Sequence, residues 1–258
     1  MIVIAIANRK GGCGKSTTAA ALSAGISARG LRCLAVDLDG QSGNLTRILG
    51  ADRDGLTSYD VLMGKSPLRD VIQHTNNGSI IAGGPALNGI DVIISGDNRE
   101  SRLKDALKTV KEDFDYVVID TPVGFGVPVI NALTAASYLI IPVQPDVLCL
   151  SGLDEMGDLA DSIRGSTNPD LNICGVLLTR FNSHLSLSQL LVPEFQNVAK
   201  ILGTKLFKTM IREGVAVKES QAQQISLFSY APRSNPARDY KKFVEELLDD
   251  LGGVGQWL

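Results

Sequence analysis

A glycine-rich segment near the start of the chain contains the residue types that bind phosphate groups. It consists, in order, of Gly11, Gly12, Cys13, Gly14, Lys15, Ser16 and Thr17. Glycines allow successive backbone N–H groups to converge on phosphate oxygens, and a helix that begins there adds the positive end of its dipole. We expect Lys15 to reach the β- and γ-phosphates of a nucleotide and the Ser16 hydroxyl to ligate Mg²⁺.

This segment departs from the general phosphate-loop pattern at its first position. The pattern GxxxxGK[ST] would begin with glycine at residue 9, where Arg9 stands instead. The backbone, lysine and hydroxyl contacts do not depend on that first glycine, so we still predict phosphate binding. The alternative is a glycine-rich turn between a strand and a helix that binds no ligand.

Carboxylates that could organise a metal ion follow two apolar, β-branched runs. Asp37 and Asp39 come after residues 33–36, and Asp120 comes directly after residues 116–119. Side chains at the carboxyl ends of central strands lie at the crevice where doubly wound folds bind ligands. A hard cation that bridges phosphates prefers oxygen ligands, so we predict that Asp120 holds Mg²⁺ through its water shell. Solvated loop acids and an ordinary buried strand ending in Asp are the alternatives.

The elements that must position these residues alternate between apolar runs and helical stretches. The predicted strands span residues 2–7, 33–36, 116–119, 138–143, 173–178 and 206–211. The predicted helices span residues 16–29, 100–112, 148–163, 188–201 and 239–251. This alternation predicts an α/β fold with a doubly wound, mostly parallel sheet and helices on both faces. We interpret the turn-rich segment 76–89 as a surface excursion and expect one domain over residues 1–258.

Composition restricts the class of protein further. The 258 residues are 44% hydrophobic and 21% charged, which excludes intrinsic disorder. The net charge of −3 gives no bulk indication of nucleic-acid binding. No apolar run approaches the roughly 18 residues that span a bilayer, and the first residues lack a signal-peptide pattern, so we expect a cytoplasmic protein. The four cysteines form no CxxC pair, as is usual where thiols stay reduced.

A lysine directly before the glycines identifies a subclass of phosphate loop. Lys10 opens the pattern KGGxGK[ST], and with it the chain resembles the ParA/MinD family of deviant-Walker ATPases. The resemblance implies ATP or ADP with Mg²⁺ as ligands, and a homodimer in which Lys10 reaches the nucleotide of the partner. No in-cis arginine finger can be identified, so Lys15 and a partner's Lys10 would stabilise the transition state. An ordinary solvated lysine is the alternative for Lys10.

Two further motifs fall where the family has them. Residues 37–41 are similar to the family's DxDPQ, with glycine in place of proline, and the resemblance implies that Asp39 positions the attacking water while Asp37 supports the Mg²⁺ shell. Residues 117–122 are similar to the Walker B strand. The following Val-Gly-Phe-Gly at 123–126 departs from the commoner Pro-Ser-Leu-Gly, so the geometry of this switch is left open.

A third motif, at residues 177–182, ends in an amide. Asn182 is similar to the family residue that reads the adenine edge, a task that suits a side chain able both to donate and to accept. Residues 210–213 resemble a second adenine wall, which includes Ile211 and Arg212. An asparagine in an ordinary turn after a strand is the alternative reading of this motif.

Charge is distributed unevenly toward the C-terminal end. Residues 200–242 contain nine basic and three acidic residues, a balance of +6, whereas residues 243–258 contain four acidic residues and no basic ones. The resemblance places DNA-contacting basic residues in this region, and non-specific double-stranded DNA needs only lysines and arginines that touch phosphates. We assign DNA binding to four residues around the start of the last helix: Arg233, Arg238, Lys241 and Lys242. A solvated basic face is the alternative.

The main hypothesis is an ATP-dependent dimerising switch with weak ATPase activity that acts in plasmid or chromosome partition with a ParB-like adaptor, on the nucleoid. One rival is a cargo-positioning ATPase with the same switch. Another is a MinD-like membrane-associated regulator, but its basic amphipathic ending is opposite in charge to this acidic one, so no membrane is expected. The early first strand leaves no room for a helix-turn-helix extension, and the lack of cysteine in residues 121–137 disfavours the iron–sulfur chemistry of nitrogenase-iron-protein relatives.

Overall fold

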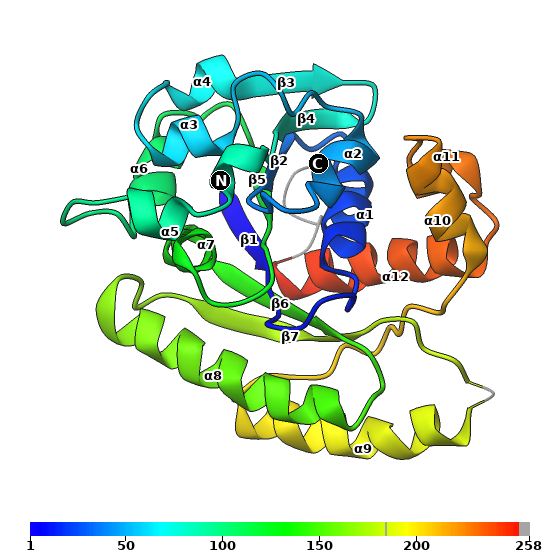
Figure 1. Cartoon of the computed structure of the whole chain (residues 1–258). Coiled ribbons are helices and arrows are strands. Elements are labelled where there is room, and N and C mark those ends of the chain that lie inside the picture. The colour runs from blue at the N-terminus through cyan, green and yellow to red at the C-terminus, as the bar shows by residue number, and fades with distance from the viewer. Residues whose placement is uncertain (184, 253–258) are drawn as a thin grey trace.

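A seven-stranded sheet forms the centre of the computed structural model, which describes residues 1–183 and 185–252. The strands are β1 (Ile2–Ile6), β2 (Cys33–Asp37), β3 (Ile72–Thr75), β4 (Gly78–Ile81), β5 (Tyr116–Asp120), β6 (Tyr138–Val143) and β7 (Asn172–Leu178). Their order is β3-β4-β2-β5-β1-β6-β7, and the β3–β4 pair is antiparallel while the other pairs are parallel (Figure 1). The predicted doubly wound α/β fold is confirmed.

Helices cover both faces of this sheet. They are α1 (Lys15–Ser27), α2 (Asn44–Leu49), α3 (Ser58–Leu62), α4 (Leu68–Val71), α5 (Ile90–Ile93), α6 (Arg102–Lys108), α7 (Val127–Ala135), α8 (Leu148–Ser166), α9 (Ser186–Ile201), α10 (Val215–Ala222), α11 (Leu227–Tyr230) and α12 (Asn235–Asp250). In Figure 1 the orange and red α10, α11 and α12 lie beside α1, whereas α8 and α9 lie beyond β6 and β7.

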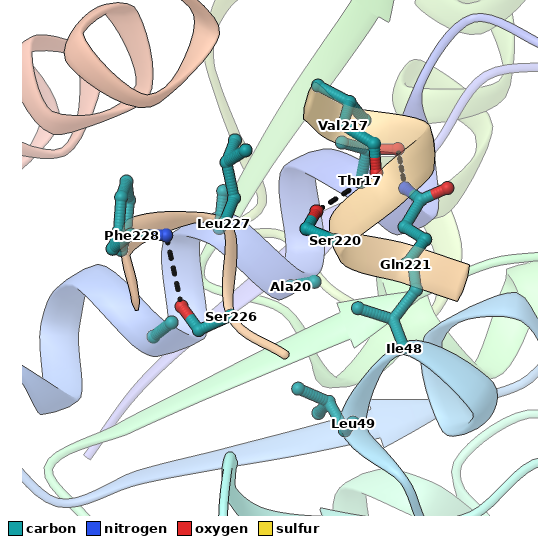
Figure 2. Close-up of a pocket in the computed structure, with 12 residues that line it drawn as sticks. Thr17, Ala20, Ile48, Leu49, Val217, Ser220, Gln221, Ser226, Leu227 and Phe228 are labelled. Carbon is teal, nitrogen blue, oxygen red and sulfur yellow. Dashed lines mark hydrogen bonds between the residues drawn. The ribbon is translucent and has the colours of Figure 1, made fainter. Parts of the chain in front are cut away.

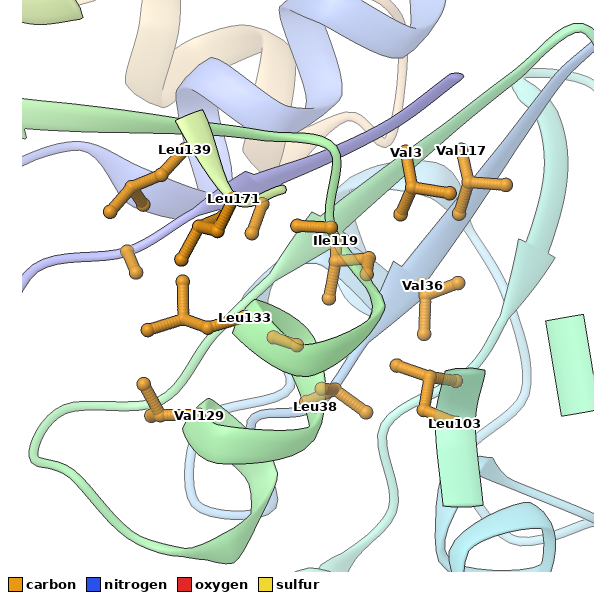
Figure 3. Packing of buried hydrophobic residues seen from close by; sticks show 14 of the residues in the cluster. Val3, Val36, Leu38, Leu103, Val117, Ile119, Val129, Leu133, Leu139 and Leu171 are labelled. Carbon is orange, nitrogen blue, oxygen red and sulfur yellow. The ribbon is translucent and has the colours of Figure 1, made fainter. Parts of the chain in front are cut away.

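Two apolar clusters, one on each face of the sheet, explain the continuous hydrophobic runs. Val3 and Ala5 of β1 belong to one cluster with α6, α7 and α8, and Ile4 and Ile6 belong to the other with α1 and α12. Figure 3 shows part of the first cluster, in which Leu133 of α7 lies near the strand residues Leu139 and Ile119. Because successive strand side chains point to opposite faces, a strand buried on both faces must be apolar at every position.

The predicted strand at 206–211 is not formed. The segment makes single contacts to β7, including a hydrogen bond from Phe207 N to Val176 O at 2.9 Å. Between these contacts, the N–H groups of Lys208 and Thr209 donate to the carboxylate of Glu246 on α12, at 2.7 and 2.9 Å. A side chain of α12 therefore takes donors that a continuous ladder would need.

The interpretation of segment 76–89 as a surface excursion is wrong in its first part. Residues 76–77 form a two-residue turn between β3 and β4, and β4 pairs with β2 inside the sheet. Ile80 and Ile81 are fully buried. The sequence correctly indicates a turn at residues 76–77, but this turn connects two strands of a hairpin. The predicted last helix begins earlier than expected, because Ser234 caps α12 by accepting a hydrogen bond from Ala237 N.

Candidate functional site

The phosphate loop connects β1 to α1, as predicted, and its backbone has the conformation that glycine allows. Gly12 and Gly14 have φ values of 77° and 87°, in the left-handed region that side chains rarely adopt. The Lys15 side chain is buried, and its ammonium donates to the carbonyl oxygen of Lys10 at 3.0 Å. The lysine thus folds back over the loop, which leaves its charge at the cradle that the glycines form.

Side chains from the ends of β6 and β7 hold the phosphate loop in place. The Thr179 hydroxyl donates to Cys13 O at 2.8 Å, and Gln144 Nε2 donates to Gly12 O at 2.6 Å. Both contacts satisfy carbonyl groups that point away from the cradle. Such anchoring fixes the backbone before a ligand arrives, which is what a pre-organised anion site requires.

The two residues before the glycines contact α8. The Lys10 ammonium donates to the carbonyl oxygen of Leu148. Arg9 forms an ion pair with Glu155 of α8 and lies 5.8 Å from the ring of Phe125. In this single chain, therefore, Lys10 is turned toward α8. It does not line the cavity above the phosphate loop, which we call the phosphate cavity.

Asp37 organises the loop after β2. Its carboxylate is fully buried and accepts hydrogen bonds from Asp39 N at 2.9 Å and from the N–H and hydroxyl of Thr46 at 2.9 and 2.6 Å. Burial raises the pKa of Asp37, although these hydrogen bonds counteract that effect. Asp39 in turn accepts from Gln41 N at 2.9 Å and from Ser42, and it lines the phosphate cavity.

Asp120 lies beside Asp37 on the neighbouring strand, but its carboxylate does not accept hydrogen bonds from a loop as that of Asp37 does. The two residues are register partners in the β2–β5 pair. Asp120 is fully buried, and within residues 1–183 and 185–252 neither of its carboxylate oxygens accepts a well-formed hydrogen bond, although the Ser16 hydroxyl lies close enough to lower its pKa. Burial raises its pKa well above the usual value, and the negative charge of Asp37 raises it further. A buried acceptor without a partner is costly, and a bound cation would remove that cost.

The donor set at this position fits magnesium. Asp120 and the Ser16 hydroxyl are hard oxygen donors, and Ser16 and Lys15 lie close enough to Asp120 to lower its pKa. The described part of the chain contains no cluster of three or more His, Cys, Asp or Glu side chains that could hold a metal by itself. Mg²⁺ commonly keeps several waters and binds one or two protein groups together with substrate phosphates, so a small donor set is suitable.

A cavity of about 580 Å³ opens above the phosphate loop. The glycines, Lys15 and Ser16 line it together with Asp39, Arg47 and Val123. A smaller cavity of about 90 Å³ adjoins it and is lined by Ile211 and Arg212, among others. The structure therefore brings the predicted phosphate ligands and one predicted adenine wall to adjoining spaces.

The second predicted adenine segment lies next to the first. Phe181 N donates to Ile211 O at 2.9 Å, and Asn182 lines a third cavity together with Arg212. The guanidinium of Arg212, however, donates to both carboxylate oxygens of Asp239 on α12, at 2.7 and 2.8 Å. The backbone N–H of Arg212 also donates to Asp239, at 3.0 Å, so the aliphatic part of the side chain is what remains for contact with a base.

A separate apolar pocket, shown in Figure 2, lies between α1, α2, α10 and α11. Its lining includes Ala20, Leu49 and Leu227, and its volume of about 30 Å³ is close to that of one water molecule. Gln221 at its edge donates from Nε2 to the hydroxyl of Thr17 at 2.9 Å (Figure 2). This pocket is too small and too apolar to hold a nucleotide phosphate, but Gln221 connects α10 to the phosphate loop.

The four residues assigned to DNA are exposed at and before the start of α12: Arg233, Arg238, Lys241 and Lys242. Residues 200–242 have fewer positive charges free to contact DNA than their nine basic residues indicate. Lys205 pairs with Asp250, and Arg212 pairs with Asp239, so two of the nine cations are neutralised within the chain. Among the helices of residues 1–183 and 185–252, none has the length and apolar content that a bilayer-spanning segment needs.

The structure places at the site residues that the sequence analysis did not identify, among them Thr46, Gln221 and Arg180. Thr46 and Gln221 come from segments without a recognisable motif, so no local signal pointed to them. Arg180 lies inside the motif at 177–182 and lines both the phosphate cavity and the smaller cavity beside it. An arginine within a motif already linked to nucleotide binding was a signal that could have identified it.

Known proteins are similar to this chain in sequence and in fold. A protein-family model described as "AAA domain" matches residues 1–173. Sporulation initiation inhibitor protein Soj of Bacillus subtilis is 36% identical over 250 residues, which cover 95% of this chain and 97% of that protein. Chromosome partitioning protein ParA of Myxococcus xanthus is 32% identical over 95% of this chain and 87% of that protein. A solved structure of cobyrinic acid a,c-diamide synthase from Mycobacterium smegmatis, with bound ATP analog and magnesium, is 30% identical with a TM-score of 0.85, covering 99% and 97% of the two chains.

Proposed function

The chain belongs to the ParA/Soj family of chromosome-partitioning P-loop ATPases, and on this premise we propose that it is an ATP-dependent dimerising switch that binds DNA without sequence preference. The observation that carries the nucleotide part is Asp120, a buried carboxylate without a partner beside Lys15 and Ser16. We infer that Mg²⁺ with ATP or ADP binds there. Mg²⁺ would supply positive charge between the phosphates when bound.

In this proposal, each step of hydrolysis is carried out by particular residues of the chain. Asp39 orients a water whose oxygen forms a bond to the γ-phosphorus, while the bond from that phosphorus to the β–γ bridging oxygen breaks and leaves ADP and phosphate. Lys15 neutralises charge on the β- and γ-phosphates, and Ser16, Asp37 and Asp120 organise the metal and its waters. Lys10 of a second copy would complete the charge around the γ-phosphate, which links the reaction to dimer formation.

The base and DNA contacts complete the proposal. Asn182 and residues 211–212 bind the adenine end, and the exposed cations of the α12 region contact phosphates of arbitrary DNA. The relatives named for chromosome partitioning support a role in moving DNA. We infer that the chain acts with a ParB-like adaptor at the nucleoid. We treat residues 1–258 as one ATPase domain, of which residues 184 and 253–258 lie outside the described part.

A two-part measurement tests the proposal. ATP hydrolysis should require Mg²⁺, so EDTA should abolish it. The turnover per monomer should rise with protein concentration, because the reaction needs a second copy. DNA binding should be detectable with ATP and absent with ADP. Hydrolysis without DNA binding would favour the rival, in which the same switch works on a cargo by other contacts, and co-sedimentation with anionic liposomes would favour the membrane-associated rival.

A further inference from the structure

Arg180 stands where the phosphate cavity meets the smaller cavity beside it. Four residues line both spaces: Gly14, Thr17, Arg180 and Gln221. Gly14 and Thr17 flank the start of α1, at one end of the phosphate cradle, and the predicted base contacts begin on the other side of this junction. A nucleotide that fills both spaces therefore passes its α-phosphate and ribose through the junction.

The charge of Arg180 is available for a ligand. Its side chain is exposed, and across residues 1–183 and 185–252 no carboxylate lies within ion-pair distance of it. Arg212, whose preceding residue Ile211 contacts Phe181, differs because Asp239 binds its guanidinium at 2.7 Å. Of the residues that line both cavities, Arg180 alone is charged.

The backbone at Arg180 is strained and held on both sides. Its φ value is 49°, in the left-handed region, and Gln224 is the only other non-glycine residue with positive φ in the described ranges. The preceding Thr179 is fixed by its hydroxyl to Cys13 O at 2.8 Å, and the following Phe181 is fixed by its N–H to Ile211 O at 2.9 Å. Strain of this kind persists where surrounding contacts determine the conformation, and it concentrates at ligand sites.

We propose that Arg180 is a nucleotide-binding residue whose guanidinium contacts the α-phosphate. The inference rests on the proposed binding of adenine nucleotide at the phosphate loop. Arginine suits this position because its planar fork can donate two hydrogen bonds to one phosphate group and keeps its charge at any physiological pH. The α-phosphate is common to ADP and ATP, so Arg180 stabilises both complexes equally and does not discriminate between them.

Titrations with ADP, a non-hydrolysable ATP analogue and adenosine test this assignment. We expect Arg180→Ala to weaken ADP and the analogue by the same factor, about tenfold or more, because a hydrogen bond to a charged group is lost. Adenosine, which lacks phosphate, should bind the variant as it binds the wild type. Arg180→Lys should recover part of the loss, since it keeps the charge without the fork.

Glycine substitutions at the two strained positions separate a ligand contact from a structural role. Arg180→Gly and Gln224→Gly both remove a side chain from a left-handed backbone, so both should keep or raise the melting temperature without ligand. Arg180→Gly alone should lose ADP affinity, whereas Gln224→Gly, whose residue lines neither nucleotide cavity, should not.

Several outcomes would overturn the inference. Wild-type ADP affinity in Arg180→Ala would remove Arg180 from the site. A loss confined to the ATP analogue would move the contact to the γ-phosphate, and an equal loss of adenosine would move it to the nucleoside. If the wild-type protein itself bound neither nucleotide, the proposed function would have failed before Arg180 was tested.

Discussion

The ammonium of Lys10 donates a hydrogen bond to the carbonyl oxygen of Leu148, the first residue of α8, within the same chain. Its nitrogen also lies 3.8 Å from the sulfur of Cys149. A lysine in this position cannot at the same time reach the nucleotide of a second copy. Because one exposed hydrogen bond contributes only about 1 kcal/mol, the exchange from this contact to a partner's phosphate is energetically accessible.

We expect Lys10→Ala to bind ATP but to lose ATP-dependent dimers and hydrolysis. The phosphate loop keeps Lys15, so nucleotide affinity should change little, whereas the charge that would cross to the partner's γ-phosphate is gone. Light scattering with a non-hydrolysable ATP analogue should show monomers where the wild type shows dimers. Lys15→Ala is the control, because it should fail already at nucleotide binding. Equal dimer populations in Lys10→Ala and wild type would contradict the role in trans.

Asp39→Ala should separate nucleotide binding from hydrolysis. The change removes the carboxylate that we propose positions the attacking water, and we expect a loss in kcat of about 10²-fold or more with nucleotide still bound. Since Asp39 also accepts hydrogen bonds from Gln41 N and Ser42 N, Asp39→Asn is the matched variant that keeps an oxygen acceptor for the loop. Both variants should accumulate ATP-bound dimers, which phosphate-release measurements and light scattering would detect. Wild-type turnover in Asp39→Asn would assign the water to another residue.

Asp120→Asn should stabilise the protein without ligand while damaging its response to magnesium. In the folded chain the carboxyl group is buried, and burial together with the charge of Asp37 raises its pKa because ionising it there is costly. A neutral amide of the same shape avoids that cost. The free energy of unfolding should rise by about 1–3 kcal/mol in denaturant titrations. Mg²⁺ should increase ATP affinity in the wild type and have little effect in the variant. A destabilised variant that still responded to Mg²⁺ would show that Asp120 is a structural residue.

The parts of the fold that were predictable are those buried on both faces. Strands β1, β2, β5, β6 and β7 are uninterrupted apolar runs, and such runs indicate a parallel sheet without any knowledge of its partners. The β3–β4 hairpin was missed because its edge strand includes Gln73 and His74 and is only four residues long. The strand expected at 206–211 fails because Glu246, from a helix almost 40 residues later, takes two of its donors.

The functional site was likewise predictable only in part, because some of its residues belong to local motifs and others depend on tertiary contacts. The phosphate loop and Asp120 could be assigned from short motifs, because each motif and the strand before it suffice to place the residue. The engagement of Asp37 with Thr46 depends on how the chain turns back after β2, and the strained position of Arg180 depends on contacts with distant segments, such as that of Thr179 with Cys13. The sequence pattern indicates which residues reach the crevice, but not which of their atoms are already occupied.

Close packing at Gly175 provides a test of the core beside β7. A Cβ atom built there would lie 2.5 Å from the Phe207 ring, which itself packs edge-on against Phe243 at a centroid distance of 5.0 Å. We expect Gly175→Ala to destabilise the fold by about 1–3 kcal/mol, because the ring cannot move without disturbing α12. Gly165→Ala on α8 is the control: nothing lies within 4 Å of its Cβ position, and alanine favours helix by about 1 kcal/mol. Equal melting temperatures for the two variants would contradict this packing.

Charge reversal at the start of α12 tests the DNA surface. Arg233 and Arg238 are exposed and have no ion-pair partner in the described ranges, so their charges are free to replace counterions on DNA. The proposed dimer would double the surface, and affinity for arbitrary duplexes should therefore depend on ATP although none of the proposed DNA contacts touches the nucleotide. The Arg233→Glu/Arg238→Glu variant should lose this binding and keep ATP binding.

A control variant reverses two positive charges on another surface, so that its net charge equals that of the Arg233→Glu/Arg238→Glu variant. Lys108, the last residue of α6, and Lys111, in the turn after it, are exposed on the opposite face of the sheet from α12, and Lys108 pairs with Asp105. The Lys108→Glu/Lys111→Glu variant changes the net charge by the same amount. Fluorescence anisotropy at several salt concentrations should give a wild-type affinity that falls steeply with salt, with a slope of about 0.9 per phosphate contact. The α6 variant should keep most of that slope, since it removes no contact. If both variants lost affinity equally, the interaction would follow net charge alone, and the assignment to the α12 region would be wrong.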